Sequence, residues 1–358
     1  MSFAETLRKD PRRRNLALLA ALAIIVTGLA VGAVWNRAVE LSPPNADQAF
    51  FPQLHNHMRD VAQIQVITKN GKLNAEFRPD RGWILPDHYN YPASFNAVRK
   101  MIVGLTAMEI IAPKTARADW LHYIDLKAPP KGKGTRVTFR DDKGKILADV
   151  IAGKTEDIGD SAGGIGLFVR HPDSDQSWLV RSVMQPDAKL ADWLDTEVMD
   201  VTRARIREVD VTPVSGPAFT VLRDKPSQGD FRVSDMPNGR VLAYDSAPDS
   251  VAAAITGFTF TDVRPAKDLD FTNSARLTTK TFDGLTIRVE TVKDGADVWA
   301  TVSAEGSADK PDSRKEARAI NAKSAGWAYK LPSFKAEQFM TTLDSLLKPL
   351  DSQTAPAK

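Results

Sequence analysis

One serine stands in a pattern that is typical of a hydrolytic nucleophile. Residues 159–163 read G-D-S-A-G and match the G-x-S-x-G pattern, in which a sharp strand-to-helix turn exposes the serine hydroxyl. The residues before Ser161 are polar, and residues 165–170 alternate like a strand instead of beginning a helix. No histidine and aspartate at a characteristic spacing complete a triad. We therefore interpret the segment as a glycine-rich hairpin connection and predict no catalytic residue.

Two further short patterns suggest metal and phosphate binding. His55 and His57 are two residues apart, a spacing that places them on one side of a strand but on different sides of a helix, and no third ligand is evident. Residues 153–155 (GKT) resemble the end of a phosphate-binding loop, but the glycine required five residues earlier is Ala148 and no helix follows. We predict no metal site, no bound cofactor and no nucleotide site.

The tryptophans suggest a third kind of site, a groove that stacks on sugars or peptides. Most of them fall on apolar faces of expected strands or helices, where packing into the core is the more common role. Those considered are Trp83, Trp120, Trp178, Trp193, Trp299 and Trp327. We therefore predict that they belong mainly to the core.

Charge and cysteine content exclude several classes of function. The chain of 358 residues has 48 lysines and arginines against 45 aspartates and glutamates. Five of the basic residues but only two of the acidic ones lie in residues 1–14, so the rest of the chain is balanced in charge. A body without a basic excess is not expected to bind nucleic acid. The absence of cysteine excludes thiol catalysis, disulfides and cysteine-ligated metal centres.

An uncharged apolar run near the N-terminus predicts a membrane anchor. Residues 15–34 are twenty residues without a charge, enough to cross about 30 Å of hydrocarbon as a helix. The basic run RKDPRRR precedes them, so the positive-inside rule keeps residues 1–14 in the cytoplasm and sends the body outside. In a bacterium this is a single-pass inner-membrane protein with a periplasmic body. A cleavable signal peptide is the alternative, with Val31 and Ala33 as the small residues before the cut.

Hydrophobic periodicity predicts a β-β-β-α unit at the start of the body. Residues 61–77 alternate apolar and polar positions around an Asn70-Gly71 turn, which indicates a hairpin. Residues 82–85 (GWIL) supply a third strand. A helix is expected after Pro92. Its predicted inward residues are Phe95, Val98, Ile102 and Leu105.

The same order returns later in the chain and predicts an internal repeat. Residues 209–222 form a hairpin pattern around Gly216-Pro217. Residues 229–233 follow this hairpin as the third strand, as GWIL does in the first unit. Pro248 then opens a helix. Its predicted inward residues are Val251, Ile255 and Phe258. We expect Trp83 and Phe231 to occupy equivalent buried positions, each under its own helix.

Other segments complete the expected secondary structure. Further hairpins are predicted at residues 136–151, 167–180 and 285–302, a short helix at 188–198, and a partial third copy at 326–346 with Ser333 as helix N-cap. Residues 303–325 are polar and are expected to be irregular. The first folded element is expected near Leu54.

These elements predict an α+β protein with two related β-β-β-α modules, mainly antiparallel sheets and helices on one face. The expected division is a cytoplasmic tail (1–14), a transmembrane helix (15–34), a juxtamembrane linker (35–53), a first periplasmic module (54–200), a second module (201–350) and a disordered tail (351–358).

The order of these features resembles a widespread bacterial family. The resemblance is carried by the W-x-L strand at residues 83–85, the YPA helix start at 91–93, the hairpins that contain residues 167–170 and 178–180, and the strands at 209–211 and 219–222. The family is a domain of unknown function, and its members are typically encoded beside Gld-type, gliding-motility-associated ABC transport systems. The motifs are structural, so the resemblance implies a fold and a genetic neighbourhood but no active site.

Two classes of function follow. The first is a non-enzymatic accessory or binding subunit of an ABC-type, Gld-like transport system, with a permease or auxiliary membrane subunit as its partner. The second is a membrane-tethered envelope hydrolase that uses Ser161. A periplasmic module that binds glycan or peptide through exposed tryptophans is a further alternative.

Overall fold

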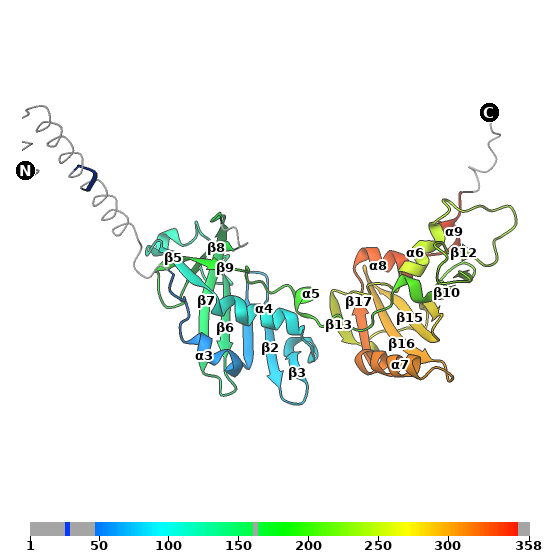
Figure 1. Cartoon of the computed structure of the whole chain (residues 1–358), viewed down its shortest axis with the longest axis horizontal. Helices are drawn as coiled ribbons and strands as arrows, with labels where there is room; N and C mark the ends of the chain where they lie inside the picture. Colours follow the sequence, from blue (N-terminus) through cyan, green and yellow to red (C-terminus); the bar gives the residue numbers. More distant parts are fainter. Residues whose placement is uncertain (1–25, 29–46, 160–163, 350–358) are drawn as a thin grey trace, which may run out of the picture.

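The computed structural model describes residues 26–28, 47–159 and 164–349 (Figure 1). The predicted membrane segment lies outside the described residues, apart from residues 26–28, which are helical. Both predicted tails, residues 1–14 and 351–358, and Ser161 also lie outside them. Within the described ranges, no helix is both long and apolar enough to cross a bilayer.

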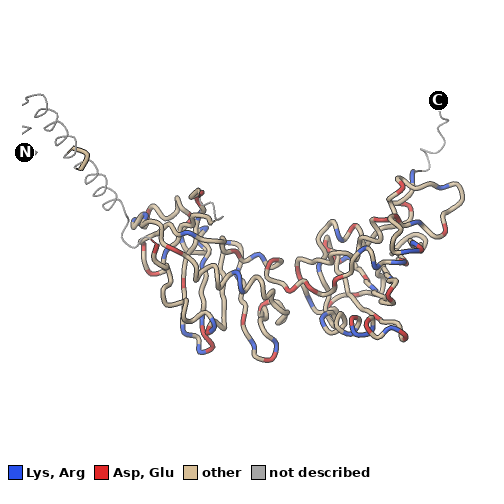
Figure 2. The backbone as a smooth tube through the Cα atoms, viewed as in Figure 1, with Lys and Arg blue, Asp and Glu red and all other residues tan. Residues whose placement is uncertain are grey.

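The body is an α+β structure built on two antiparallel sheets, as its sequence pattern predicts. Figure 1 shows the sheets as two lobes that lie side by side, connected through α5 (Leu190–Trp193). The first sheet has nine strands in the order β4-β3-β2-β1-β6-β7-β8-β9-β5. The second has eight, in the order β12-β11-β10-β14-β15-β16-β17-β13. Basic and acidic residues are interspersed over both lobes (Figure 2).

The first lobe contains two of the helices and all the strands up to β9. The helices are α3 (Leu54–His57) and α4 (Phe95–Thr106). The strands are β1 (Gln63–Ile67), β2 (Lys72–Arg78), β3 (Gly82–Leu85), β4 (Tyr91–Pro92), β5 (Glu109–Pro113), β6 (Thr135–Arg140), β7 (Ile146–Glu156), β8 (Ile165–Arg170) and β9 (Ser177–Ser182).

The second lobe contains the remaining strands and four helices. The strands are β10 (Ile206–Thr212), β11 (Phe219–Leu222), β12 (Arg232–Val233), β13 (Asp262–Pro265), β14 (Ala275–Thr281), β15 (Leu285–Asp294), β16 (Asp297–Gly306) and β17 (Trp327–Lys330). The helices are α6 (Ala247–Ala253), α7 (Pro311–Ser324), α8 (Ser333–Phe339) and α9 (Leu343–Leu346). The predicted border at residue 200 lies between β9 and β10.

Helix α4 forms where the sequence predicts it, with a different buried face. The hydroxyl of Ser94 accepts a hydrogen bond from the backbone N–H of Ala97 at 3.3 Å and caps the first turn. The buried stripe is Val98, Met101 and Leu105. The predicted inward residue Phe95 is 67% exposed, and Ile102 is only partly buried, because both lie beside the 98–101–105 stripe rather than in it.

The two sheets have the same strand order when their strands are matched along the chain. β10, β11 and β12 take the places of β1, β2 and β3, β13 takes that of β5, and β14 to β17 take those of β6 to β9. β4 has no counterpart among the described strands of the second sheet. A helix follows the third strand in each lobe, after β4 in the first, as α4 and α6. The predicted recurrence of a β-β-β-α order is thus present in the strand topology.

The register extends this correspondence to Trp83 and Phe231. Ile84, the residue after Trp83, pairs with a residue of β2. Arg232, the residue after Phe231, pairs with the residue at the corresponding position of β11. Phe231 is buried, with 3% of its surface exposed, whereas Trp83 is only half-buried and lies beside Phe77. The two positions are topologically equivalent but differ in burial.

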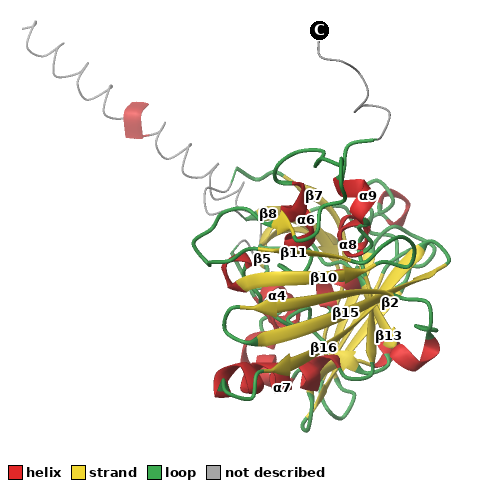
Figure 3. Ribbon diagram, turned by 90° about the vertical axis from the view of Figure 1, so that its right-hand side faces the viewer, coloured by secondary structure: helices red, strands yellow, loops and turns green. Residues whose placement is uncertain are grey.

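Helix α7 corrects the expectation that residues 303–325 are irregular. β16 continues to Gly306, and α7 runs along the edge of the second sheet beside β16 (Figure 3). The side chain of Asn321 bonds both the N–H and the C=O of Ala304, at 2.8 and 2.7 Å, where β17 no longer pairs with β16. The helix was missed because most of the residues it buries are small, so the sequence has no apolar stripe. They are Ser313, Ala317, Ile320 and Ser324.

Gly306 permits this close approach of α7. A Cβ at Gly306 would collide with the backbone of Arg314 in the first turn of the helix. The start of α7 therefore packs directly on the end of β16.

Other predicted boundaries also shift. Of the helix expected at 188–198, only α5 forms, because the chain at Trp193 and Leu194 pairs with the segment before α4. The partial third copy forms β17 and two short helices, and Pro332 rather than Ser333 is the N-cap of α8. β12 has only two residues instead of the five expected.

The folded chain begins earlier than the predicted start near Leu54. The backbone N–H of Asp47 donates to the C=O of Ile110, and that of Phe50 to the C=O of Met108, both at 2.8 Å. Phe50 and Phe51 are buried in the core. Residues 47–53 of the predicted linker therefore belong to the first lobe.

A cluster of aromatic rings joins the two lobes. Tyr91, on the edge strand β4, makes edge-to-face contacts with Trp327, Phe260 and Tyr329 of the second lobe, with centroid distances of 5.0, 6.1 and 6.4 Å. The Tyr91 hydroxyl donates to the C=O of Asp195 at 3.0 Å. Burial raises the pKa of both tyrosine hydroxyls well above the usual range, so both remain neutral. The cores of the two lobes are continuous through these rings.

The unequal burial of Trp83 and Phe231 gives a test of the fold. Phe231→Ala is expected to lower the free energy of unfolding by about 3–5 kcal/mol, because it leaves a cavity in the core. Trp83→Ala is expected to cost less, because Trp83 is only partly buried, whereas Phe231 is almost completely removed from water. Chemical denaturation of both variants measures the difference. A larger loss for Trp83→Ala would contradict the burial described.

Candidate functional site

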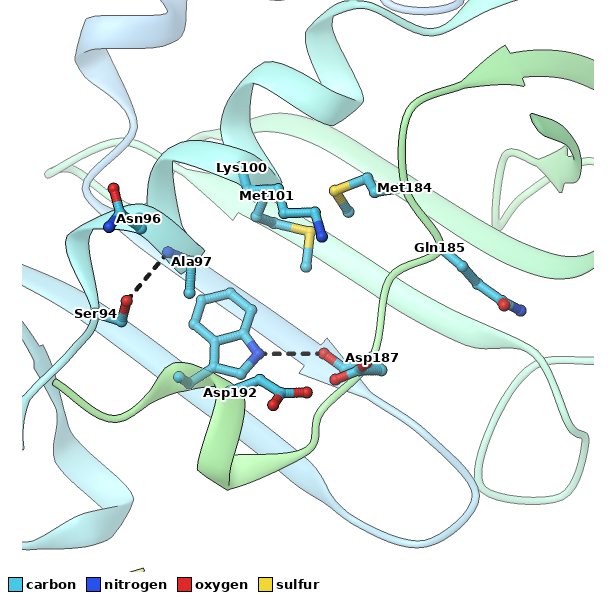
Figure 4. A pocket seen from close by; sticks show the side chains of 10 residues that line it. Ser94, Asn96, Ala97, Lys100, Met101, Met184, Gln185, Asp187 and Asp192 are labelled. Atoms are coloured by element: carbon cyan, nitrogen blue, oxygen red, sulfur yellow. Dashed lines mark hydrogen bonds between the residues drawn. The ribbon is translucent and has the colours of Figure 1, made fainter. Parts of the chain in front are cut away.

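In the first lobe, the chain after β9 runs alongside α4 and forms one wall of a pocket. Residues 183–193 follow the length of the helix and end in α5 (Figure 4). Met184 packs on Gly104, where a Cβ would lie 2.5 Å from the Met184 sulfur. The hydroxyl of Ser182 donates to the C=O of Met184 at 2.7 Å and fixes the turn into this segment. A glycine inside α4 thus allows residues 183–193 to lie close to the helix.

The pocket between α4 and residues 183–193 has a volume of about 300 Å³ (Figure 4). Its buried surface is apolar and comes from Met101, Met184 and Trp193. Its exposed rim is polar and carries charges of both signs. The remaining lining residues are Ser94, Asn96, Ala97, Lys100, Gln185, Asp187 and Asp192. The pocket therefore has a small apolar floor under a charged rim.

Hydrogen bonds hold the wall opposite α4. The indole N–H of Trp193 donates to the backbone C=O of Asp187 at 3.3 Å. The Asp187 carboxylate accepts from the backbone N–H of Lys189 at 2.9 Å, and the Lys189 ammonium lies 3.8 Å from Asp192. Both aspartates nevertheless remain exposed. The rim on this side is negative and faces water.

The α4 side of the rim is positive. Lys100 is exposed and has no ion pair within 4 Å among the residues described. A ligand with an apolar group and an adjacent charge matches both the floor and the rim, because the floor removes apolar surface from water and the rim charges orient the ligand. A pocket of this size is at the lower end for small molecules and accommodates a single large side chain of a partner.

Two other hollows lie in the second lobe, each of about 610 Å³. One lies between residues 196–200 and α7, where Glu197 and Lys323 line it. The other lies between the β10–β11 turn and Met340. Arg205 forms a bidentate ion pair with Glu316 beside the first hollow, at 2.8 and 2.6 Å. These charges are paired with each other, so this hollow offers fewer free groups to a ligand.

The residues that were considered for metal and phosphate binding lie in ordinary structural positions in the described chain. His55 and His57 are exposed on α3, and Nδ1 of His57 lies 2.6 Å from the Asp60 carboxylate. In the described ranges, no group of three or more potential metal ligands is present. Residues 153–155 belong to β7, and a Cβ at Gly153 would collide with the C=O of Ile124. That glycine is thus explained by packing.

The tryptophans are distributed between the core and the surface. Trp193 and Trp299 are buried, at 3% and 6% exposure. The half-buried ones are Trp83, Trp178 and Trp327. Trp120, at 49%, is the most exposed of the six in the described chain. Packing explains most of them, as predicted, and Trp193 forms part of the pocket.

Sequence reasoning did not find this pocket. Its lining comes from two segments about ninety residues apart, and most of these residues are ordinary surface types. One signal was available: Gly104 interrupts an otherwise apolar helical pattern, and an isolated glycine there often marks a close packing contact.

The fold and the pocket together define an α+β protein with an amphipathic surface pocket on its first lobe. The chain matches the family described as "Domain of unknown function (DUF4340)" over residues 83–279, more than half of its length, and it belongs to that family. The match begins in β3 and ends in β14, so it includes strands of both sheets and the junction between them. No curated protein and no solved structure matches the chain.

The contact of Gly104 with Met184 predicts that Gly104→Ala has opposite effects on stability in the native protein and in a Met184→Ala variant. Gly104→Ala in the native protein is expected to lower the free energy of unfolding by about 1–3 kcal/mol, because the new methyl group displaces Met184. In a Met184→Ala background the same substitution is expected to stabilise the helix by about 0.5–1 kcal/mol. Denaturation of the four proteins of this cycle measures the coupling. Equal effects in both backgrounds would contradict the packing described.

Proposed function

We propose that the protein is a non-enzymatic binding subunit, anchored in the bacterial inner membrane by residues 15–34, with its two-lobed body in the periplasm. Its partner in this proposal is a permease or auxiliary membrane subunit of an ABC-type, Gld-like transport system. The pocket beside α4 is the contact point that recognises the partner. The family has no assigned function, so the partner class comes from the sequence resemblance.

The anchor is supported by the sequence pattern. An uncharged run of twenty residues preceded by a basic tail has the length and charge asymmetry of a single-pass helix with its N-terminus in the cytoplasm. Twelve residues separate that run from Asp47, which is paired with the sheet. The body would therefore stay close to the membrane that holds the partner.

The pocket is the observation that carries the binding role. Its floor offers Met101, Met184 and Trp193, and flexible methionines beside an aromatic ring suit a partner side chain of varied shape. Lys100 on one side and the two aspartates on the other give the rim charges of both signs. Such an arrangement orients a docked segment more than it changes its chemistry.

Photocrosslinking from the pocket rim tests this function. A photoreactive residue is placed at Gln185 of the full chain in native membranes, and the crosslinked protein is identified by mass spectrometry. A transporter permease or auxiliary subunit is the expected product. The matched control is the same photoreactive residue at the exposed Lys143, in the β6–β7 turn, which should give no such product.

The rim charge provides a second arm of the experiment. Lys100→Glu in the Gln185 background is expected to lower the crosslink yield by up to about fivefold, about 1 kcal/mol for an exposed charge. Lys143→Glu should leave it unchanged. The Gln185 probe yielding no transport subunit would contradict the proposed partner.

Topology and chemistry are checked separately. A reporter that works only outside the cytoplasm should be active when fused after Lys358 and inactive when fused before Arg8.

Ser161→Ala should leave the cellular phenotype unchanged. Loss of function at a normal protein level would instead favour the envelope hydrolase.

A further inference from the structure

The loop between β5 and β6, residues 114–134, is an addition to the first lobe. It has twenty-one residues, whereas the corresponding connection in the second lobe, between β13 and β14, has nine. It covers Ile151 of β7 and Phe168 of β8, which lie on the opposite face of the sheet from the main core. The strand order does not require a connection of this length.

This β5–β6 loop is firmly built. Leu121 and Leu126 are buried against Ile151 and form a small core of their own. The guanidinium of the buried Arg170 donates to the C=O of Leu126 at 2.9 Å. A Cβ at Gly132 would collide with the backbone of Lys127, so the loop folds tightly on itself. Its surface residues are therefore presented in fixed positions.

The same loop exposes large aromatic side chains. Trp120 and Tyr123 are 49% and 65% exposed, although the chain next to them is well packed. The Arg117 guanidinium carbon lies 4.8 Å from the centroid of the Trp120 ring, and the ring centroids of His122 and Tyr123 are 3.8 Å apart. Tryptophan and tyrosine at a rigid surface are enriched where proteins meet the headgroup region of a bilayer.

The loop is also positively charged. Its exposed basic residues are Lys114, Arg117, Lys127, Lys131 and Lys133. Its two acidic residues are Asp119, which is paired with Arg117 at 2.8 Å, and Asp125. The net charge favours an anionic surface, and the exposed aromatic rings favour its interfacial layer.

The point at which the chain joins the body lies near this loop. Ala49 is bridged to Glu109 in an antiparallel sense, and Asp47 bonds Ile110. Asp47 and Ala49 therefore lie beside β5, and the β5–β6 loop begins directly after β5 ends at Pro113. The twelve residues between Val34 and Asp47 span at most about 43 Å when fully extended.

From these observations we propose that the β5–β6 loop docks on the anionic phospholipid surface of the membrane that anchors the chain. Trp120 and Tyr123 enter the headgroup layer, and the lysines pair with lipid phosphates. Docking holds the first lobe against the bilayer in one orientation. This inference rests on the proposed membrane anchor.

Site-directed spin labelling of the full chain tests the docking, and the absence of native cysteine makes every label unique. The label is placed at the exposed Ala118, which leaves Trp120 and Tyr123 intact, and at the exposed Ala308 of the second lobe as a control. The protein is reconstituted in vesicles with or without phosphatidylglycerol. With that lipid, the label at Ala118 should lose access to a water-soluble nickel reagent, and the label at Ala308 should not.

Charge reversal in the loop sharpens the result. Lys131→Glu with Lys133→Glu should lower the ratio of docked to undocked protein by at least about fivefold for each lysine that is replaced. A matched pair elsewhere in the first lobe, Lys143→Glu with Lys145→Glu, should leave it unchanged. Trp120→Ala with Tyr123→Ala should also restore the access of the reagent.

The outcomes separate the two proposals. Failure of the full chain to float with vesicles would overturn the anchor. A chain that floats but has equal access at Ala118 and Ala308 would overturn the docking and leave the anchor intact. Protection at Ala118 only in native membranes, and not in pure lipid vesicles, would assign the loop to a protein partner and overturn the lipid proposal.

Discussion

The packing of Tyr91 against the second lobe is the constraint on which the arrangement of the body depends. Tyr91 lies on β4, the strand that has no counterpart in the second sheet, and it places its ring among Phe260, Trp327 and Tyr329. Its hydroxyl is held by the C=O of Asp195, in the segment that leads from the first sheet to the second. The extra strand and the connecting segment thus meet at one buried cluster. Two sheets that would otherwise be separate lobes share a continuous core.

The matching strand orders indicate a duplicated module whose copies have acquired different additions. The first copy carries β4, the β5–β6 loop and the pocket beside α4, whereas the second carries α7 along the edge of β16. In the proposed function these additions have separate tasks. β4 joins the copies, whereas the pocket is the proposed contact with the partner and the loop the proposed contact with the membrane. The shared sheets serve mainly as the scaffold that fixes the distances between them.

Sequence reasoning predicted the parts of this fold that depend on local patterns. Alternation and turn residues located both hairpins of the repeat, and the helix after Pro92 was predicted from its spacing. Long-range packing was not predictable in this way. Lys335 has a typical surface side chain, yet it is 5% exposed and its ammonium donates to the C=O groups of Ala254 and Thr256 after α6. Burial lowers the pKa of this ammonium. The pocket was missed for the same reason, because its two walls come from segments about ninety residues apart in the chain.

The rigidity of the two-lobed body is tested most directly by a distance measurement between the lobes. Spin labels at two exposed positions, Lys143 of the first lobe and Lys293 of the second, report that distance by pulsed electron resonance in an otherwise cysteine-free chain. We expect one narrow distance distribution in the native protein and a broad one after Tyr91→Ala, which removes the ring that joins the cores. A broad distribution in the native protein, or a narrow one that Tyr91→Ala leaves unchanged, would contradict the account.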